Sequence, residues 1–372
     1  MTKENIVISA VNFTSGGPLS VLKDCLFYAN RNLSQHYNVV ALVHSCKLFE
    51  GDGFANIEFI EFPDSVRSYK NRLRLEYIGF KGLSKRLKPY LWLSLHDITP
   101  NVDATIRAVY CHNPSPFYRP ILREIILDKP FFLFTLFYKS FYRFNIKEND
   151  YVIVQQQWLR ERFIDMFNLD PVKVVVSYPE VKPICRDGLS TRTNIREKYT
   201  FFYPSFPRVF KNFEVVLEAV NILNSCSLRD NFEVLITIDG SENSYAASLL
   251  EKYSGLENVR FLGLLSREDV YSMYENSDCL IFPSKLETWG LPLTEAKQFN
   301  LPILAADLPY AHETVGCYEK ISFFDPLSPE ELSNLMRGAI VKDAYGSVLS
   351  STVPGMPFAE NWASLFNILL KK

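Results

Sequence analysis

The stretch from Asp278 to Gly316 constrains the fold of this chain more than any other. It begins with the short apolar run Cys279–Phe282, which is typical of a buried strand in a parallel sheet. A polar loop follows, and Gly290 and Pro292 then introduce a helical pattern, since proline is tolerated in a first helical turn. The apolar run Leu301–Ala306 predicts the next strand. Strand, loop, helix and strand form one repeat of a doubly wound α/β sheet, in which ligands bind beyond the carboxyl ends of the strands.

The same alternation of short apolar runs and helical segments extends over most of the 372 residues. Further strands are predicted at Ile6–Ala10, Tyr37–Val43, Ile57–Phe62, Leu91–Leu95, Ala108–Cys111, Tyr151–Val154, Tyr199–Tyr203, Phe232–Ile238 and Val259–Leu262. Alternation at this spacing implies parallel sheets with helices on both faces. We therefore predict an α/β fold of two doubly wound, Rossmann-like domains that face a cleft.

Domain boundaries follow from composition. Residues 179–198 are rich in Pro, Asp, Gly, Ser and Arg and have little periodicity, which makes them the best candidate for an interdomain linker. The linker separates an N-terminal domain, residues 1–178, from a C-terminal domain, residues 199–350. Residues 351–372 include a helical pattern from Pro357 to Lys372, and we expect this helix to pack back toward the N-terminal domain.

Net charge and cysteine usage exclude several classes of protein. The formal net charge is −2, so nothing in the overall balance suggests a nucleic-acid partner. The seven cysteines are an odd number without C-x-x-C spacing, which fits reduced thiols in a cytosolic protein better than a disulfide framework or a zinc site. The N-terminus has no signal-peptide architecture, and no apolar run approaches the ~20 residues that span a bilayer.

Two segments combine basic and aromatic side chains. Residues 67–88 hold eight basic residues and one acidic residue, and residues 117–147 include eight aromatic side chains between Phe131 and Phe144. A basic, aromatic and amphipathic segment can lie in a membrane interface. The alternative is a helix that packs over the sheet and extends its basic side chains to water. We favour contact with a membrane surface.

Two carboxylates, Glu287 and Glu295, bracket the loop and helix start of the first stretch. Between them, Gly290 and the first N–H groups of the helix offer a seat for an anion such as phosphate. Because a carboxylate beside that seat repels phosphate, we expect Glu287 and Glu295 to accept hydrogen bonds from sugar or ribose hydroxyls. The alternative is that Glu295 stabilises the helix N-terminus and Glu287 is a solvated loop residue.

Three motifs in the second half of the chain match a known family. They are N-V-R-F-L-G at 258–263, C-L-I-F-P-S-K-L-E-T-W-G-L-P-L-T-E-A from Cys279, and L-P-I-L-A-A-D-L-P-Y-A-H-E from Leu301. With its E-x7-E spacing, this half resembles family 4 of the retaining glycosyltransferases, which use nucleotide sugars and have the two-domain GT-B fold. The resemblance is strongest from Tyr203 to Asp325 and is of the bacterial surface-polysaccharide type.

The resemblance implies roles for residues of the second domain. Glu287 would contact the donor hexose as part of the catalytic machinery, and Glu295 would contact the nucleotide ribose. Gly290 and Leu291 would present backbone N–H groups near the donor diphosphate.

The family also holds the diphosphate with a basic pair. Lys211 matches its lysine. Its arginine falls where this chain has Phe206, and Arg208 is the nearest cation, so we assign Arg208 to that role.

In the first domain the family often places a histidine near the transferred sugar. His112, in V-Y-C-H-N-P, fits best, and His96, in S-L-H-D, is the second candidate. Gly16 and Gly17 match a glycine turn that faces the donor from this domain; they precede a helical segment that starts near Leu19. A tight turn without a binding role is the alternative for the two glycines.

The resemblance implies transfer of a hexose or deoxyhexose from a nucleoside diphosphate sugar to a glycan acceptor, with retention of anomeric configuration. We expect a lipid-linked or oligosaccharide acceptor, as in O-antigen assembly, and a cytoplasmic protein at the inner face of the membrane. No metal or other cofactor is expected, since D-x-D does not occur in the chain. The alternatives are a GT-B nucleotide-sugar epimerase and a non-catalytic protein that binds sugar nucleotides.

Overall fold

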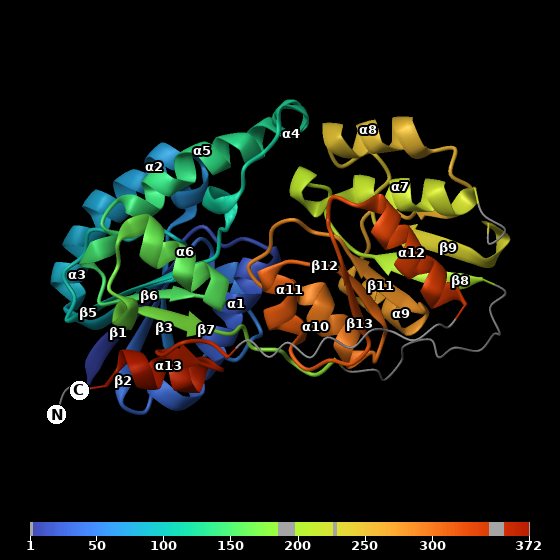
Figure 1. Cartoon of the computed structure of the whole chain (residues 1–372). Coiled ribbons are helices and arrows are strands. Elements are labelled where there is room, and N and C mark those ends of the chain that lie inside the picture. The colour runs from blue at the N-terminus through green and yellow to red at the C-terminus, as the bar shows by residue number, and fades with distance from the viewer. Residues whose placement is uncertain (1–2, 185–197, 226–228, 342–352, 372) are drawn as a thin grey trace. The chain divides into compact units, whose positions relative to one another are not determined.

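The structure, a computed structural model, describes residues 3–184, 198–225, 229–341 and 353–371. It divides into two compact units (Figure 1). Unit 1 consists of residues 1–117, 135–180 and 354–372, and unit 2 of residues 118–134 and 181–353. Most of the predicted linker, residues 185–197, lies outside the described residues, as do Cys185 and Cys226.

Unit 1 is built on a parallel sheet. Its strands are β1 (Glu4–Ala10), β2 (Tyr37–Val43), β3 (Ile57–Glu61), β4 (Pro89–Ser94), β5 (Ile106–Cys111), β6 (Tyr151–Val154), β7 (Val174–Ser177) and β14 (Phe358–Ala359). Their order is β14-β7-β6-β5-β4-β1-β2-β3. The chain therefore builds outward from β1 in one direction and from β4 in the other. In doubly wound folds ligands bind at such a reversal, beyond the carboxyl ends of the strands.

Helices cover both faces of this sheet because the side chains of β1 alternate between them. The helices of unit 1 are α1 (Gly16–Tyr28), α2 (Tyr69–Arg74), α3 (Phe80–Leu87), α6 (Gln157–Phe167), α13 (Trp362–Leu369) and the last part of α5 (Lys129–Arg143). Ile8 lies in one buried core with Leu26 of α1 and Leu365 of α13. Val7 lies in a second core with Phe80 of α3. Figure 1 shows α13, in red, against this sheet.

Unit 2 holds a second parallel sheet. Its strands are β8 (Tyr199–Tyr203), β9 (Phe232–Ile236), β10 (Val259–Phe261), β11 (Cys279–Phe282), β12 (Ile303–Ala306) and β13 (Ile321–Phe324). Its helices are α4 (Leu122–Leu127), the first part of α5, α7 (Phe213–Asn224), α8 (Ser244–Tyr253), α9 (Arg267–Glu275), α10 (Leu291–Gln298), α11 (Pro309–Val315) and α12 (Pro329–Ile340). The strand order β10-β9-β8-β11-β12-β13 reverses between β8 and β11. The predicted α/β class with doubly wound sheets is confirmed.

Three features differ from the sequence-based expectation. Strand β13 was not predicted. The segment Pro357–Lys372 is not helical throughout, because Phe358 and Ala359 pair with Val176 and Ser177 at the edge of the first sheet before α13 begins. The predicted first domain also included residues 118–134, which the structure groups with unit 2.

Residues 118–134 belong to unit 2 because their side chains contact residues of that unit. The ring of Phe131 lies 4.7 Å from the ring of Phe210, measured between centroids. Asp128 pairs with Arg208 at 2.9 Å. Packing and charge thus tie this segment to the loop after β8, and its composition did not reveal these partners.

Candidate functional site

One candidate site lies where unit 2 reverses its strand order. Lys211 follows β8, and Glu287 follows the neighbouring strand β11. Lys211 Nζ and Glu287 Oε1 are 2.5 Å apart, and both side chains are more than four-fifths buried, with exposures of 18% and 14%. The Tyr203 hydroxyl donates to the Lys211 carbonyl oxygen at 2.5 Å, which holds the chain after β8 in place. The fold thus brings together two of the predicted site residues that lie far apart in the sequence.

Gly290 sets the turn between Glu287 and helix α10. Its φ is +82°, a conformation that favours glycine. A Cβ added there would lie 3.1 Å from Phe282 Cε1 and 3.3 Å from Leu293 Cδ1. Gly290 is also the N-cap of α10 and supplies no capping side chain, so the first N–H groups of this helix have no side-chain cap, and their binding of an anion stays a prediction.

Glu295 lies beyond the first turn of α10, and its carboxylate contacts α9 rather than the helix N-terminus. The Tyr274 hydroxyl donates to Glu295 Oε2 at 3.1 Å. Burial raises the pKa of Glu295, while the hydrogen bond from Tyr274 and the charge of Arg267 act in the opposite direction. This geometry does not support the alternative in which Glu295 only stabilises the helix N-terminus.

Arg208, the other predicted phosphate cation, is held by a residue that the sequence analysis missed. Arg208 Nη1 lies 2.9 Å and 3.2 Å from the two carboxylate oxygens of Asp128. A second such pair joins Lys285, in the loop after β11, to Glu124. The spacing of Glu124 and Asp128 predicts a shared helix face, but nothing in the sequence points to their cationic partners.

In unit 1 the first candidate, His112, follows β5 directly. Asp97 holds its backbone: Asp97 Oδ1 accepts from the N–H groups of His112 at 2.5 Å and Asn113 at 3.2 Å. The hydroxyls of Tyr142 and Tyr138 donate to the same carboxylate, each at 2.8 Å. Asp97, which was not among the predicted site residues, accepts these four hydrogen bonds from a left-handed backbone conformation with a φ of +71°.

The ring of His112 packs against two aromatic rings and has one nitrogen without a hydrogen-bond partner among the described residues. It stacks on Tyr110 with 4.5 Å between ring centroids and meets the ring of Phe13 edge-on. Burial lowers its pKa, against the opposing charge of Asp97. Its Nε2 is buried and has no hydrogen-bond partner among the described residues, so the hydrogen-bonding capacity of this nitrogen is unused.

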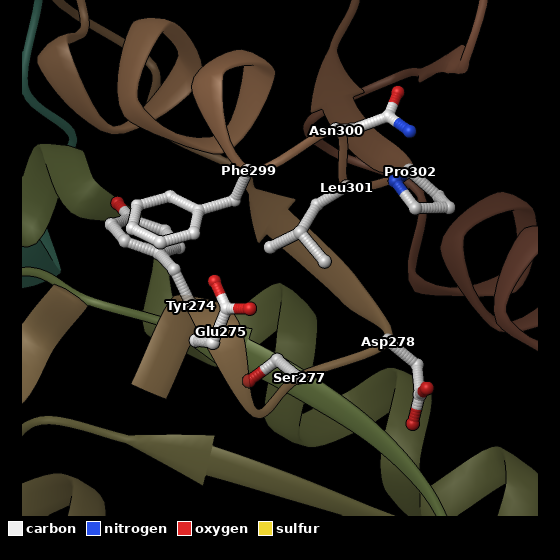
Figure 2. A pocket seen from close by; sticks show the side chains of 8 residues that line it. All are labelled: Tyr274, Glu275, Ser277, Asp278, Phe299, Asn300, Leu301 and Pro302. Carbon is white, nitrogen blue, oxygen red and sulfur yellow. The ribbon is translucent and has the colours of Figure 1, made fainter. Parts of the chain in front are cut away.

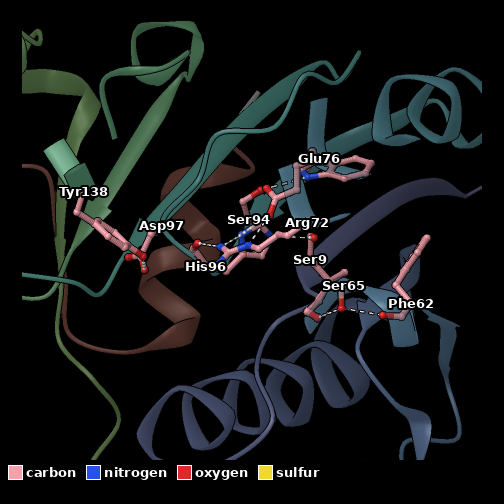
Figure 3. Close-up of polar contacts among 11 residues, drawn as sticks. Ser9, Phe62, Ser65, Arg72, Glu76, Ser94, His96, Asp97 and Tyr138 are labelled. Atoms are coloured by element: carbon pink, nitrogen blue, oxygen red, sulfur yellow. Dashed lines mark hydrogen bonds and ion pairs between the residues drawn. The ribbon is translucent and has the colours of Figure 1, made fainter. Parts of the chain in front are cut away.

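His96, the second candidate, is enclosed in a polar network (Figure 3). Its side chain is 0% exposed, and its Nε2 lies 3.1 Å from Ser9 Oγ. Arg72 donates to the His96 carbonyl oxygen at 2.8 Å and to Glu76 Oε1 at 2.9 Å. Burial and the charge of Arg72 hold the pKa of His96 well below its usual value. A neutral, fully buried His96 cannot reach a sugar, which favours His112.

Gly16 and Gly17 are exposed and begin helix α1 rather than preceding it. Gly16 has a φ of +68°, which favours glycine. A Cβ added at either position would meet nothing within 4 Å. Neither glycine is therefore required by internal packing, and both leave open space beyond β1.

Comparisons with known proteins assign the second half of the chain. Residues 190–344 match a family model described as "Glycosyl transferases group 1". The match covers less than half of the chain, so it shows that this half is similar to group 1 glycosyltransferases. The O-antigen chain mannosyltransferase RfbU of Salmonella typhimurium is 24% identical over 220 residues, which cover 56% of this chain and 54% of RfbU. The chain thus spans about half the length of this curated relative.

Solved structures extend the likeness to the whole fold. WaaG, a glycosyltransferase involved in lipopolysaccharide biosynthesis, matches with a TM-score of 0.66 and 18% identity over 90% of each chain. Anabaena HepE in complex with UDP and glucose matches with a TM-score of 0.60 and 15% identity over 92% of this chain and 91% of that chain. The predicted GT-B fold is thereby confirmed.

A pocket of unit 2 lies at the amino ends of β11 and β12, away from the carboxyl-end loop of Glu287 (Figure 2). Ser277, Asp278 and Leu301 are among the residues that line it. In Figure 2 the rings of Tyr274 and Phe299 lie face to face on one side, with 5.4 Å between centroids. The pocket contains none of the predicted site residues, but Tyr274 connects its wall to Glu295.

Neither a metal-binding cluster nor a membrane-spanning helix is found among the described residues. In those ranges, His, Cys, Asp and Glu side chains do not gather in groups of three or more that could hold a metal ion. Among the described helices, none has the length and apolar character needed to cross a membrane.

Proposed function

We propose that this protein is a glycosyltransferase that moves a hexose or deoxyhexose from a nucleoside diphosphate sugar to a glycan acceptor, with retention of anomeric configuration. The observation that carries the proposal is the close pairing of Lys211 with Glu287 at the strand reversal of unit 2, in the half of the chain that is similar to group 1 glycosyltransferases. The UDP and glucose bound to HepE support a nucleotide-sugar donor. The name of RfbU makes mannose the first sugar to test.

In this proposal the charged residues bind different parts of the donor. Lys211 and Arg208 neutralise the diphosphate, aided by the N–H groups at the start of α10. Glu287 accepts hydrogen bonds from hydroxyls of the hexose, and Glu295, held by Tyr274, accepts them from the ribose. His112 contacts the transferred sugar through Nε2, and Gly16 and Gly17 leave room for the donor.

The proposed chemistry needs no covalent nucleophile. The bond between the anomeric carbon and the diphosphate oxygen breaks, and the acceptor hydroxyl oxygen forms the new bond on the same face of the sugar. The hydroxyl proton passes to the departing phosphate oxygen. Orientation of the two substrates and stabilisation of charge on the diphosphate are then the tasks of the protein. We propose that no metal ion takes part, so transfer is expected to continue in EDTA.

We also propose a lipid-linked acceptor and contact with the cytoplasmic face of a membrane. The observation behind this is helix α5, which buries Phe131 and Tyr138 but exposes Leu133, Leu136 and Phe137 to 50%, 55% and 52%. Exposed apolar side chains with basic neighbours suit a membrane interface.

Residues 67–88 support membrane contact less well than their composition suggested. Arg72 is 7% exposed and paired with Glu76, so it is no surface cation. Lys81 pairs with Asp103. Ion pairs within unit 1, rather than attraction to lipid, therefore explain part of this basic run.

Binding to vesicles of anionic lipid tests the membrane proposal. Replacement of Leu133, Leu136 and Phe137 by serine is expected to reduce cosedimentation. Leu327→Ser is the control, since Leu327 is 77% exposed but lies outside α5. Equal vesicle binding by the triple serine variant and the Leu327→Ser control would contradict membrane contact through this helix.

The catalytic proposal is tested with UDP-, GDP- and dTDP-sugars. Thermal unfolding first identifies the donor, since a ligand at ~100 times its Kd adds about 2.7 kcal/mol to stability. Transfer to a lipid-linked oligosaccharide is then followed by product analysis, and the anomeric configuration of the product tests retention. Conversion of the donor sugar without an acceptor would point to the epimerase instead. Neither stabilisation nor turnover with any donor would contradict the proposed activity.

A further inference from the structure

Three ion pairs meet around the loop that follows β8. Lys211 pairs with Glu287, as described above. Arg208 pairs with Asp128, and Lys285 pairs with Glu124. The carboxylates of the last two pairs belong to residues 118–134, whose composition is otherwise basic and aromatic.

The three cations belong to one cluster. The Lys285 N–H donates to the Phe210 carbonyl oxygen at 2.7 Å, which joins the loop after β11 to the residue before Lys211. The ammonium groups of Lys211 and Lys285 lie 5.5 Å and 5.8 Å from the ring centroids of Phe210 and Tyr118. Tyr118 and Phe131 both contact Phe210, so these aromatic rings pack together beside the lysines.

The acidic partners are buried and share a helix face. Glu124 is 8% exposed and Asp128 is 6% exposed. They are four residues apart at α4 and its end, so their side chains project from the same side. Each also accepts a hydrogen bond from its own segment, from the N–H of Ile121 to Glu124 and from the N–H of Phe131 to Asp128.

We propose that Arg208, Lys211 and Lys285 form a single phosphate-binding cluster, and that Glu124 and Asp128 are its resident counter-ions, which the donor diphosphate replaces. The inference rests on the proposed function, because it takes these cations to be those of the donor site. It adds Lys285 to the binding residues and gives residues 118–134 a role in setting donor affinity.

The donor diphosphate and the two carboxylates compete for the same cations. A cation in a short ion pair has its charge already neutralised, and a diphosphate that approaches it also meets the negative charge of its partner. Binding of the diphosphate must therefore break or weaken the pairs of Arg208 and Lys285. The partly buried setting makes this competition stronger than it would be in bulk water. Glu287 differs from Glu124 and Asp128 because the proposed function gives it a sugar to bind.

The test replaces each counter-ion by its amide. Asp128→Asn and Glu124→Gln remove the charge but keep an oxygen that can accept the hydrogen bonds of Phe131 and Ile121. The probes are UDP, GDP, dTDP and inorganic pyrophosphate, with binding measured by calorimetry. Asp103→Asn is the matched control, since it also breaks one ion pair, with Lys81, but in unit 1.

We expect each amide variant to bind the preferred diphosphate about three- to tenfold more tightly than the wild type, because a carboxylate no longer competes for the cation. Lys285→Ala should weaken binding, and Asp103→Asn should leave it unchanged. A purely structural role, in which the carboxylates hold the cations in place, predicts the opposite sign for the amide variants. Thermal unfolding of each variant confirms that it folds. Binding by the Glu124 and Asp128 variants tests the inference at two positions independently.

Unchanged or weaker binding by both amide variants would overturn the inference while leaving the proposed function intact. Absence of nucleoside diphosphate binding in the wild type would instead contradict the proposed function. In that case pyrophosphate decides the inference alone: tighter binding by Asp128→Asn supports the counter-ion role, and no change overturns it.

Discussion

The ammonium of Lys211 and the carboxylate of Glu287 lie 2.5 Å apart although 76 residues separate them in the chain. The reversal of strand order in unit 2 makes this contact, because it sets the carboxyl ends of β8 and β11 side by side. Tyr203 and Tyr310 lie close enough to Glu287 that its charge contributes to the raised pKa of both hydroxyls, although burial is the larger cause. Most of the predictions below concern contacts of this kind, which join distant parts of the sequence.

Glu287→Ala is expected to reduce sugar transfer by about a hundredfold or more, as is typical when a group that contacts the reacting substrate is removed. Its free energy of unfolding should fall by about 1–3 kcal/mol, because the largely buried ammonium of Lys211 loses its partner. Lys211→Ala and the double variant complete a mutant cycle, measured by turnover and by denaturant unfolding. If Glu287→Ala and Lys211→Ala lose equal stability and keep their donor affinity, the pair has a structural role only.

Gly290→Ala should lower the free energy of unfolding by about 2–3 kcal/mol, since it combines an unfavourable φ with contact against Phe282 and Leu293. Gly51→Ala is the control. Gly51 has a φ of +84°, close to the +82° of Gly290, but an added Cβ there meets nothing within 4 Å. We expect about 1–2 kcal/mol for that variant from backbone strain alone. Urea denaturation of both proteins measures the difference, and equal losses would show that packing at Gly290 adds nothing.

Asp97→Ala should destabilise the protein by about 2–4 kcal/mol, because it leaves the N–H groups of His112 and Asn113 and the hydroxyls of Tyr138 and Tyr142 without their acceptor. Asp97→Asn should cost less than half as much, since asparagine tolerates a positive φ and keeps one oxygen. Because the charge of Asp97 raises the pKa of His112, the asparagine variant should lower it further. An NMR titration of the His112 ring checks the shift, and an unchanged pKa would contradict it.

The buried pair of Glu76 and Arg72 should make stability depend on pH. Burial raises the pKa of Glu76 from 4.5 to about 7, with Asp97 also raising it and Arg72 lowering it. Between these values the unfolded state releases a proton that the folded state keeps, so this group lowers stability as pH rises, by ~3 kcal/mol at most. The depressed pKa of His96 acts in the opposite sense, since its unfolded form binds the extra proton below about pH 6.5.

Comparison of the wild type with Glu76→Gln separates the two groups. The stability of the wild type relative to the variant is expected to decrease from pH 5 to pH 7, as measured by denaturant unfolding at each pH. The variant alone should become more stable over the same range through His96. A constant difference between the two proteins would show that Glu76 titrates normally.

Sequence-based prediction succeeded where local pattern and function coincide. The runs Tyr37–Val43, Tyr151–Val154, Tyr199–Tyr203 and Cys279–Phe282 are strands with the predicted limits, because a short apolar run in a parallel sheet has few other solutions. The sequence S-R-E-D from Ser266 is typical of a helix cap, and the Ser266 side chain accepts a hydrogen bond from the Asp269 N–H at the start of α9. Strand β14 was missed because its two residues form a strand only through their pairing with β7.

The tertiary structure decided what the local pattern left open. By itself, the sequence determined an α/β chain with a turn and a helix start around Glu287, Gly290 and Glu295, since turn geometry and helix starts depend on neighbouring residues. Only the fold paired Lys211 with Glu287 and surrounded His96 with buried partners, while it left His112 Nε2 without a hydrogen-bond partner among the described residues. It also tied residues 118–134 to unit 2, because ion pairs and ring contacts between distant segments depend on which strands become neighbours.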